Sequence, residues 1–290
     1  MSNEIGIWDR QLRPHFWWLR RLSIVHTLAR QYRRLRLRIA GVQVYNQDGL
    51  RTIHDHTFMK DPAFRRAYRR GVASARADHH WHWRVHVGLW AANHAKSLAG
   101  DFVECGVSSG FLSSAIMTAI DWNALDRTFY LLDTFRGIDE RYVSEAEKDN
   151  GIMRHSARNI TSGLYAVDVD AVRQNFSEWH RTRIIVGSVP ETLAQVDAQR
   201  IAFLHLDLNC AIPEARALNH FWDRLTPGAL VLMDDYAYHG ASVQKALLDE
   251  VAHSKGVSIV ALPTGQGLLI KPPDAGRKNL VIDRQDGAPH

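Results

Sequence analysis

Cysteine is scarce in this sequence, and long apolar runs are missing from it. Cys105 and Cys210 are the two cysteines among 290 residues, too few for the disulfide framework of a small secreted domain, so we expect a reducing, cytoplasmic setting. No apolar run reaches the roughly 18 residues that span a membrane, and arginines interrupt the N-terminal stretch where a secretory signal would lie. The G-x-G-x-x-G fingerprint is missing too, which argues against a nicotinamide-dependent dehydrogenase.

Positive charge gathers in the first 40 residues. They contain nine arginines and two acids, a net charge of +7, whereas the other 250 residues carry a net charge of −2. Trp17 and Trp18 lie among the arginines, and a basic amphipathic helix with tryptophans is typical of peripheral contact with a membrane. The alternative is a helix that packs on the rest of the chain or on a second copy in a homodimer. Nucleic acid is not an expected partner, because no recognition motif accompanies the charge.

The segment GDFVECGVSSG, residues 100–110, predicts a ligand-binding turn. An apolar strand ends at Glu104, Gly106 and Gly110 follow, and a helical pattern begins at Phe111. A strand, a glycine turn and a helix start place a nucleotide-like ligand at the carboxyl edge of a parallel sheet. The spacing E-x-G-x-x-x-G suits a ligand without a pyrophosphate, and Glu104 suits a cationic one such as S-adenosylmethionine. The alternative is an ordinary strand–helix turn.

Five apolar runs, each ending in polar or glycine residues, alternate with helical patterns. We therefore expect an α/β fold with a doubly wound, mainly parallel, Rossmann-like sheet, completed to seven strands by residues 258–262 and 267–271 and preceded by an N-terminal helical extension. Asp133 ends the second strand, 23 residues after Gly110, where an acid can bind both hydroxyls of a ribose. The five runs are residues 102–104, 128–133, 183–189, 201–209 and 229–236.

Acidic residues end two strands that would be neighbours in such a sheet. Asp207 follows one strand, and Asp234 and Asp235 follow the next. Three carboxylates that converge repel one another unless a cation or a proton intervenes, and Mg²⁺ prefers hard oxygen ligands. We therefore predict a magnesium site, at which the metal would lower the pKa of a hydroxyl. The alternative for Asp234 and Asp235 is a solvated loop or a helix cap.

Five motifs, in this order, resemble the macrocin O-methyltransferase family over roughly residues 60–271: VECGVSSG, LLDTFRGI, VGSVPETL, LHLDLN and LVLMDDY. The resemblance implies a class I O-methyltransferase that uses S-adenosylmethionine and Mg²⁺ to methylate a hydroxyl of a sugar or glycosylated natural product. It also implies roles for single residues. Glu104, Gly106 and Gly110 would bind the methionine part of the cofactor, Asp133 its ribose and Ser188 its adenine side, with Asp207, Asp234 and Asp235 on the metal.

One position departs from the family pattern. The family carries a second acid two residues after Asp207, a candidate general base, and this chain has Asn209 there. An amide cannot accept the proton, although its oxygen can still bind a metal. His155 lies in the polar segment 136–165, which we expect to be a loop acting as a lid or binding segment, and it becomes a candidate base in a catalytic set with Asp207 and Asn209. The alternative is a histidine on the surface. The alternative function is a cofactor-binding protein of the same fold that does not methylate.

We expect four parts along the chain. They are a basic amphipathic helical arm (1–45), a helical cap (46–99), the catalytic domain (100–275) and a flexible tail (276–290), with a turn at residues 44–49 near the first boundary. In the cap, His82 and His86 have the helical spacing of zinc ligands, but no Glu of an H-E-x-x-H motif lies between them. We therefore expect an aromatic helix that covers the cofactor side of the sheet, with these histidines at its rim.

Overall fold

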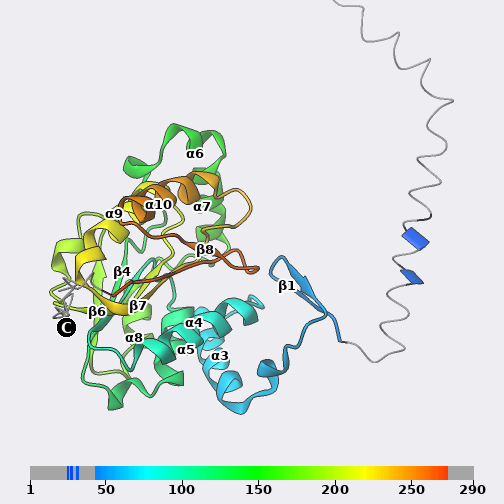
Figure 1. Ribbon diagram of the computed structural model, residues 1–290, viewed down its shortest axis with the longest axis horizontal. Coiled ribbons are helices and arrows are strands. Elements are labelled where there is room, and N and C mark those ends of the chain that lie inside the picture. The colour runs from blue at the N-terminus through cyan, green and yellow to red at the C-terminus, as the bar shows by residue number, and fades with distance from the viewer. Residues whose placement is uncertain (1–24, 26, 29–30, 33–42, 274–290) are drawn as a thin grey trace, which may run out of the picture. The chain divides into compact units, whose positions relative to one another are not determined.

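The computed structural model describes residues 25, 27–28, 31–32 and 43–273 (Figure 1). The predicted arm lies almost wholly outside the described residues, and the predicted tail lies outside them entirely, so the four-part division stays a prediction. The chain divides into a unit that ends at His56 and a larger unit from Thr57 onward. No helix among the described residues is long and apolar enough to cross a membrane.

The described part of the first unit is a small hairpin. Strands β1 (Tyr45–Gln47) and β2 (Leu50–Thr52) pair antiparallel. The two residues between them, Asp48 and Gly49, have φ of 49° and 70°. An Asp-Gly pair tolerates two successive positive φ angles, which is the geometry of a tight hairpin turn. The turn expected at residues 44–49 is therefore present.

The larger unit is built on a seven-stranded sheet with the order β5-β4-β3-β6-β7-β9-β8. The first five strands in this order are parallel, and β9 and β8 add an antiparallel pair at one edge. The expected fold class is confirmed. The strands are β3 (Asp101–Cys105), β4 (Phe129–Asp133), β5 (Thr182–Val186), β6 (Ile201–Leu206), β7 (Leu225–Met233), β8 (Val260–Ala261) and β9 (Gly267–Ile270).

Helices cover both faces of this sheet. On one face lie α4 (His82–Ala95), α5 (Phe111–Ala119) and α8 (Val169–Asn175), with α3 (Pro62–Ala75) packed on α5. On the other face lie α9 (Ala211–Phe221) and α10 (Ser242–Ser254). The short 3-10 helices are η1 (Thr57–Lys60), η2 (Trp122–Ala124), η4 (Leu193–Gln195) and η5 (Trp222–Arg224).

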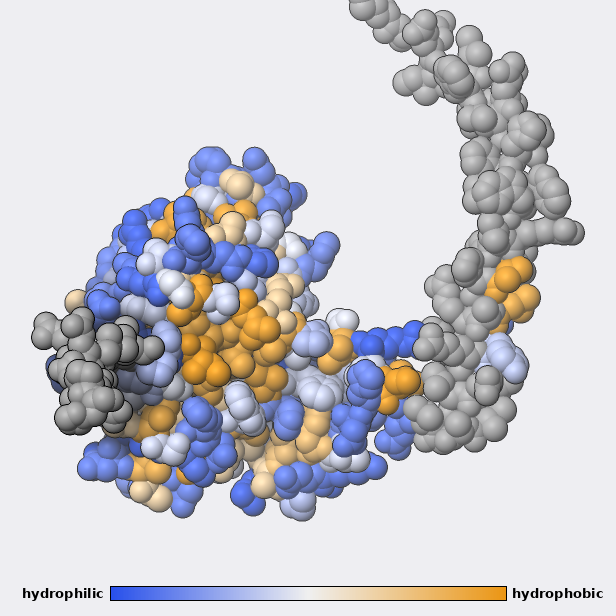
Figure 2. All heavy atoms as spheres, viewed as in Figure 1, coloured by the Kyte–Doolittle hydropathy of each residue, from blue (hydrophilic) through white to orange (hydrophobic). Residues whose placement is uncertain are grey.

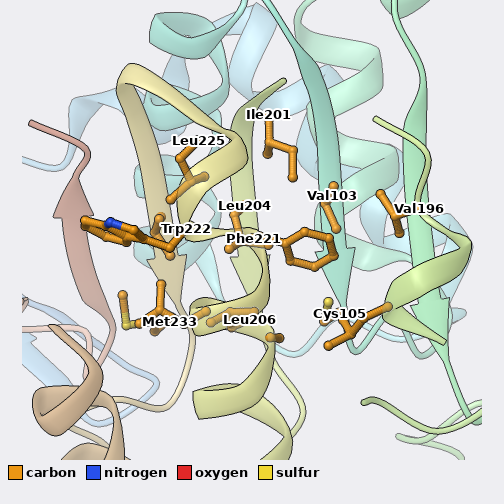
Figure 3. Packing of buried hydrophobic residues seen from close by; sticks show 14 of the residues in the cluster. Val103, Cys105, Val196, Ile201, Leu204, Leu206, Phe221, Trp222, Leu225 and Met233 are labelled. Carbon is orange, nitrogen blue, oxygen red and sulfur yellow. The ribbon is translucent and has the colours of Figure 1, made fainter. Parts of the chain in front are cut away.

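Alternation of side chains along the strands produces two buried cores. On β3, Phe102 faces the α4–α5 side, while Val103 and Cys105 face the α9–α10 side. Figure 3 shows the second core, where Phe221 and Trp222 lie over the strand side chains. Strands buried on both faces are continuous apolar runs in the sequence, which is why these strands could be predicted from it.

The segment 136–165 is not the loop that the sequence led us to expect. It contains η3 (Glu140–Tyr142), α6 (Glu145–Asp149) and α7 (Ile152–Thr161), which Figure 1 draws in green. Ser144 and Glu147 form a capping box that starts α6, and Gly151 takes φ 78° between α6 and α7. Helix α6 is short and polar and is defined by its cap, so an apolar-period search passes over it. In α7, by contrast, Ile152, Met153 and Ile160 recur at helical spacing, a signal that the loop prediction overlooked.

Candidate active site

An open pocket of about 640 Å³ lies at the carboxyl ends of the central strands. The strand order reverses between β3 and β6, and ligands of such sheets bind at this switch point. Five of the ten predicted site residues line the pocket. Gly106, Asp133 and Ser188 form what we call the glycine-turn end, and Asp207 and Asn209 belong to the acidic end, which we define to include the adjacent Asp234 and Asp235.

Asp133, at the end of β4, holds the glycine turn in place. Its Oδ2 accepts the backbone N–H groups of Val107 and Ser108 at 2.7 and 2.8 Å, and its Oδ1 accepts the N–H of Phe135 at 2.7 Å. Oδ1 also accepts the Thr134 hydroxyl at 3.5 Å, a long bond that a ligand hydroxyl can replace. The carboxylate thus orders the turn and faces the pocket at once.

The two glycines of the turn make room for protein atoms. A Cβ on Gly106 would lie 1.8 Å from the carbonyl oxygen of Asp207, and one on Gly110 would lie 2.3 Å from the Phe176 ring. Their φ angles, 91° and 82°, also favour glycine. We expected these glycines to let the backbone approach a ligand. Gly106 does line the pocket, but the contacts that require glycine at both positions are internal.

Glu104 lies beneath the pocket and not in its wall. It is 3% exposed, and its Oε1 pairs with Nδ1 of His205, on the neighbouring strand β6, at 2.9 Å. Among the described residues, neither Glu104 Oε2 nor His205 Nε2 has a hydrogen-bond partner. An acceptor left open on a buried acid suits the cationic part of a ligand. His205 is a residue that the sequence analysis missed, although it lies in the LHLDLN motif.

Ser188 follows β5 and belongs to a polar cluster at the rim. Its hydroxyl donates to Asp139, which also receives Arg141 Nη2 at 2.6 Å. The Arg141 guanidinium holds the pKa of the Asp139 carboxyl well below its usual range. Ser188 and Asp139 both line the pocket. A charged acceptor and a hydroxyl at this rim can bind the polar edge of a ligand.

Asn209 supports the Asp207 side chain. Its Nδ2 donates to Asp207 Oδ1 at 2.9 Å, and its backbone has φ 53°, a left-handed conformation that asparagine tolerates well. Glu214 of α9 fixes the same turn, since its Oε1 accepts the N–H groups of Leu208 and Asn209 at 3.0 and 3.1 Å. Burial, and then the charges of Asp234 and Asp235, raise the pKa of Asp207 well above its ordinary value.

Arg84 of α4 enters the acidic end, which the sequence analysis did not foresee. Its Nη1 pairs with Asp234 Oδ2, lies 3.5 Å from Asp235 Oδ1 and donates to the Asp234 backbone carbonyl at 3.1 Å. The Arg84 side chain is 8% exposed. A lone arginine in the apolar helix segment WHWRVHVGLW was the available signal, because a buried arginine needs an anionic partner.

The three acids of the predicted metal site do not fit a magnesium ion in this arrangement. Among the described residues, the group of three acidic, histidine or cysteine side chains whose ligand atoms lie within 4.8 Å of one another is Asp78, His80 and His82. Both carboxylate oxygens of Asp234 already have partners: Oδ2 pairs with Arg84, and Oδ1 accepts a hydrogen bond from Gln266 Nε2 at 2.9 Å. The cation beside these carboxylates is a guanidinium.

The predicted histidines lie outside the pocket wall. His155 is exposed on α7 and does not line the pocket. His86 stacks on Phe58 with ring centroids 3.9 Å apart, and His82 stacks on Tyr68 at 4.4 Å. Both rings therefore pack on aromatic side chains, and His82 also belongs to the group with Asp78 and His80.

The segment 136–165 is held by hydrogen bonds to the glycine turn and to the start of α9. The Ser108 hydroxyl, in the glycine turn, donates to the Leu164 carbonyl at 2.8 Å and accepts the N–H of Ala166, just past the segment, at 3.0 Å. Glu147 Oε1, in α6, accepts the N–H of Ala211, at the start of α9, at 2.8 Å. Gly137, Ile138, Asp139 and Tyr165 line the pocket, so the segment forms part of its wall.

The strand order and the pocket at the switch point are those of the class I methyltransferase fold. The O-methyltransferase NovP has a similar structure, with a TM-score of 0.56 and 21% identity, and the match covers 66% of this chain and 80% of that one. The sequence model for macrocin-O-methyltransferase matches residues 89–258, more than half of the chain. The chain therefore belongs to the macrocin-O-methyltransferase family.

Two curated relatives match part of the chain. One is the 8-demethyl-8-(2,3-dimethoxy-alpha-L-rhamnosyl)-tetracenomycin-C 4'-O-methyltransferase of Streptomyces olivaceus, 29% identical over 150 residues, 49% of this chain. The other is the mycinamicin III 3''-O-methyltransferase of Micromonospora griseorubida, 26% identical over 144 residues, 47% of this chain. The match spans about half the length of these relatives, 55% of each.

Proposed function

We propose that this chain is an S-adenosylmethionine-dependent O-methyltransferase that acts on a hydroxyl of a sugar or glycosylated natural product. The observation that carries the proposal is Asp133, an acid that ends the second parallel strand and orders the glycine turn at the switch point. Family membership and the two sugar-methylating relatives support the acceptor class. When bound, S-adenosylmethionine supplies an electrophilic methyl group on a sulfonium.

The cofactor would be held at the glycine-turn end. Asp133 would accept the ribose hydroxyls, Ser188 would contact the adenine side, and Gly106 and Gly110 would shape the turn around the methionine part. Glu104 has an open, buried acceptor oxygen, which supports a role toward a cationic ligand. These residues bind and orient, and most of the catalysis would come from such positioning.

Proton removal is assigned to the acidic end. We propose that Asp207 accepts the proton of the acceptor hydroxyl while the oxygen–methyl bond forms and the sulfur–methyl bond breaks. Burial raises the pKa of Asp207, which makes its carboxylate a stronger base than an exposed one. Asn209 orients Asp207 through its amide. His155 stays a second candidate base, and a His155→Ala variant with unchanged rate would remove it.

A bound Mg²⁺ ion has less support than the S-adenosylmethionine cofactor. The resemblance implies Mg²⁺ on Asp207, Asp234 and Asp235, but Arg84 already neutralises two of these acids. None of the proposed steps depends on a metal.

A second function of a different class follows from Asn209. A family member that lacks the usual acid at this position could bind the cofactor without methylating. Calorimetric titration with S-adenosylhomocysteine and with NAD, followed by a screen for methyl transfer to glycosides, separates the functions. We expect S-adenosylhomocysteine to bind, NAD not to bind, and a glycoside to be methylated. Binding without transfer to any glycoside would favour the second function, and no S-adenosylhomocysteine binding would contradict both.

We propose two partners beyond the acceptor, a second copy of the chain and a membrane surface. A homodimer is supported by the sheet edge, where Val260 and Ile270 are 54% and 55% exposed and Figure 2 shows apolar residues across the middle of the face. A cytoplasmic chain whose basic arm touches a membrane should pellet with anionic vesicles at low salt and dissociate at high salt. A chain that starts at Asn46 is the control. If both chains stay in the supernatant, the arm packs on protein instead.

A further inference from the structure

We propose that Arg84, and not a divalent cation, supplies the positive charge at the acidic end of the pocket, so that methyl transfer by this chain is independent of metal. The proposal rests on the function proposed above, and it goes beyond that function by naming the group that neutralises the acids. Three carboxylates that lie close together repel one another unless a cation or a proton intervenes.

The contacts of Arg84 are those of a fixed counter-ion. One nitrogen, Nη1, reaches an oxygen of Asp234, the Asp234 backbone carbonyl and, at 3.5 Å, an oxygen of Asp235. The guanidinium also lies over the Tyr238 ring, 4.9 Å from its centroid. An arginine side chain keeps its charge in proteins, so this positive charge is permanent. Arg84 therefore already supplies a positive charge to Asp234 and Asp235, the two acids that follow β7.

The acids themselves are committed to this arrangement. Asp234 is 17% exposed, and its second oxygen accepts the amide of Gln266, which is fully buried. A metal would have to displace a buried ion pair and would leave the guanidinium beside a divalent charge. Breaking a buried pair by removing one partner is strongly unfavourable, because the other charge stays unpaired.

Arg84 acts on the site through its neighbours. It contacts Asp234 and Asp235, and it does not line the pocket. Arg84 is a positioning residue in this account, since it acts through the acids and does not touch the acceptor.

Metal binding tests the proposal without any need for turnover. Mn²⁺ is titrated by electron paramagnetic resonance, with S-adenosylhomocysteine present, into a chain carrying His80→Gly. This change breaks up the competing group of Asp78, His80 and His82, and glycine readily adopts the φ of 59° at that position. We expect no stoichiometric Mn²⁺ site. Adding Arg84→Gln should create one Mn²⁺ site that Mg²⁺ competes for and that Asp234→Asn removes.

A stoichiometric Mn²⁺ site in the chain with Arg84 intact, lost on Asp234→Asn, overturns the proposal. This outcome is measured without any Arg84 variant, so it can overturn the proposal even if Arg84→Gln does not fold. Where Arg84→Gln folds, as judged by circular dichroism and S-adenosylhomocysteine affinity, Arg84→Lys is its matched control, because it keeps the charge and should not gain the site.

Turnover provides the second readout. Methyl transfer by the wild-type chain should persist after dialysis against EDTA, and transfer by Arg84→Gln should become dependent on added Mg²⁺. Loss of wild-type transfer in EDTA, restored by Mg²⁺, contradicts the proposal. A chain that binds S-adenosylhomocysteine but methylates nothing contradicts the proposed function instead, and the Mn²⁺ titration still decides which cation the acids hold.

Discussion

At the glycine-turn end of the pocket, Asp133 lies in the wall, as expected from the strand that it ends, whereas at the acidic end Asp234 is held by Arg84, 150 residues away in sequence. At the first end, Gly106, Asp133 and Ser188 lie at or just after the ends of strands that the sequence predicted, β3, β4 and β5. The second end also depends on α4, a helix that packs on β6 and β7 and comes from an earlier part of the chain. Local motifs therefore describe the glycine-turn end well, and they do not report what neutralises the acids.

Replacing Asp207 should have the largest effect. Asp207→Asn keeps the shape of the side chain but removes the proton acceptor, so kcat should fall about 10²–10⁴-fold while S-adenosylhomocysteine affinity changes little. Rates with one accepted glycoside and calorimetry on the same sample provide the check. Asp223→Asn, on an exposed turn, is the matched control. Unchanged turnover would remove Asp207 from the mechanism.

Replacing Asp133 sharpens the other side of the comparison. Asp133→Ala should weaken S-adenosylhomocysteine binding by about 1.5–3 kcal/mol, since it removes hydrogen bonds to a charged acceptor and loosens the turn at Val107 and Ser108. Calorimetric titration measures this loss. Asp126→Ala is the control, because that exposed acid pairs with Arg181 on the surface. Equal affinity in a folded Asp133→Ala variant would separate Asp133 from the cofactor.

Restoring the family's acid tests whether the acidic end has adapted to Asn209. The Asn209 amide donates to Asp207, so Asn209→Asp would replace that bond with a second negative charge beside it. We expect turnover to fall by about 10-fold or less, because Asp207 then holds its proton more tightly. Steady-state rates over a pH series show the change. A faster variant would mean that the missing acid limits the chemistry and that Asn209 is not an adapted residue.

The smallest effect concerns stability near the acidic end. Burial, and then the charge of Asp235, raise the pKa of Glu214 from an ordinary 4.5 to about 8. The folded chain therefore holds this proton more tightly than the unfolded chain, so the associated stability is complete below about pH 4.5 and is lost as the pH rises through about 8.

The measurement is the free energy of unfolding of wild type and Glu214→Gln between pH 5 and pH 8. Glutamine cannot ionise, so the variant should lose less stability than wild type as the pH rises over this range. Glu178→Gln is the control, since Glu178 is exposed. Parallel pH dependences in wild type and Glu214→Gln would show that Glu214 does not carry its proton across this range.

The sequence was sufficient for the sheet but not for the whole site. Apolar runs such as residues 201–206 are strands buried on both faces, and their acidic ends lead directly to the pocket. Two features escaped. Helix α6 depends on its cap, Ser144 with Glu147, and carries no apolar period, whereas the apolar period of α7 was overlooked. Arg84 and His205 take their roles from partners on distant elements, and spacing along the chain does not encode such pairs.

Gly106 connects the two ends of the pocket through a direct backbone contact with Asp207. Its missing Cβ is the space that the Asp207 carbonyl occupies, so the turn proposed to shape the cofactor site rests directly on the backbone of the proposed base. Any larger residue at position 106 would push on both at once. A chimera that exchanged the turn of this chain for that of a relative would therefore have to keep this glycine, or else re-form the acidic end together with the turn. A substitution at position 106 would therefore alter cofactor binding and proton removal together.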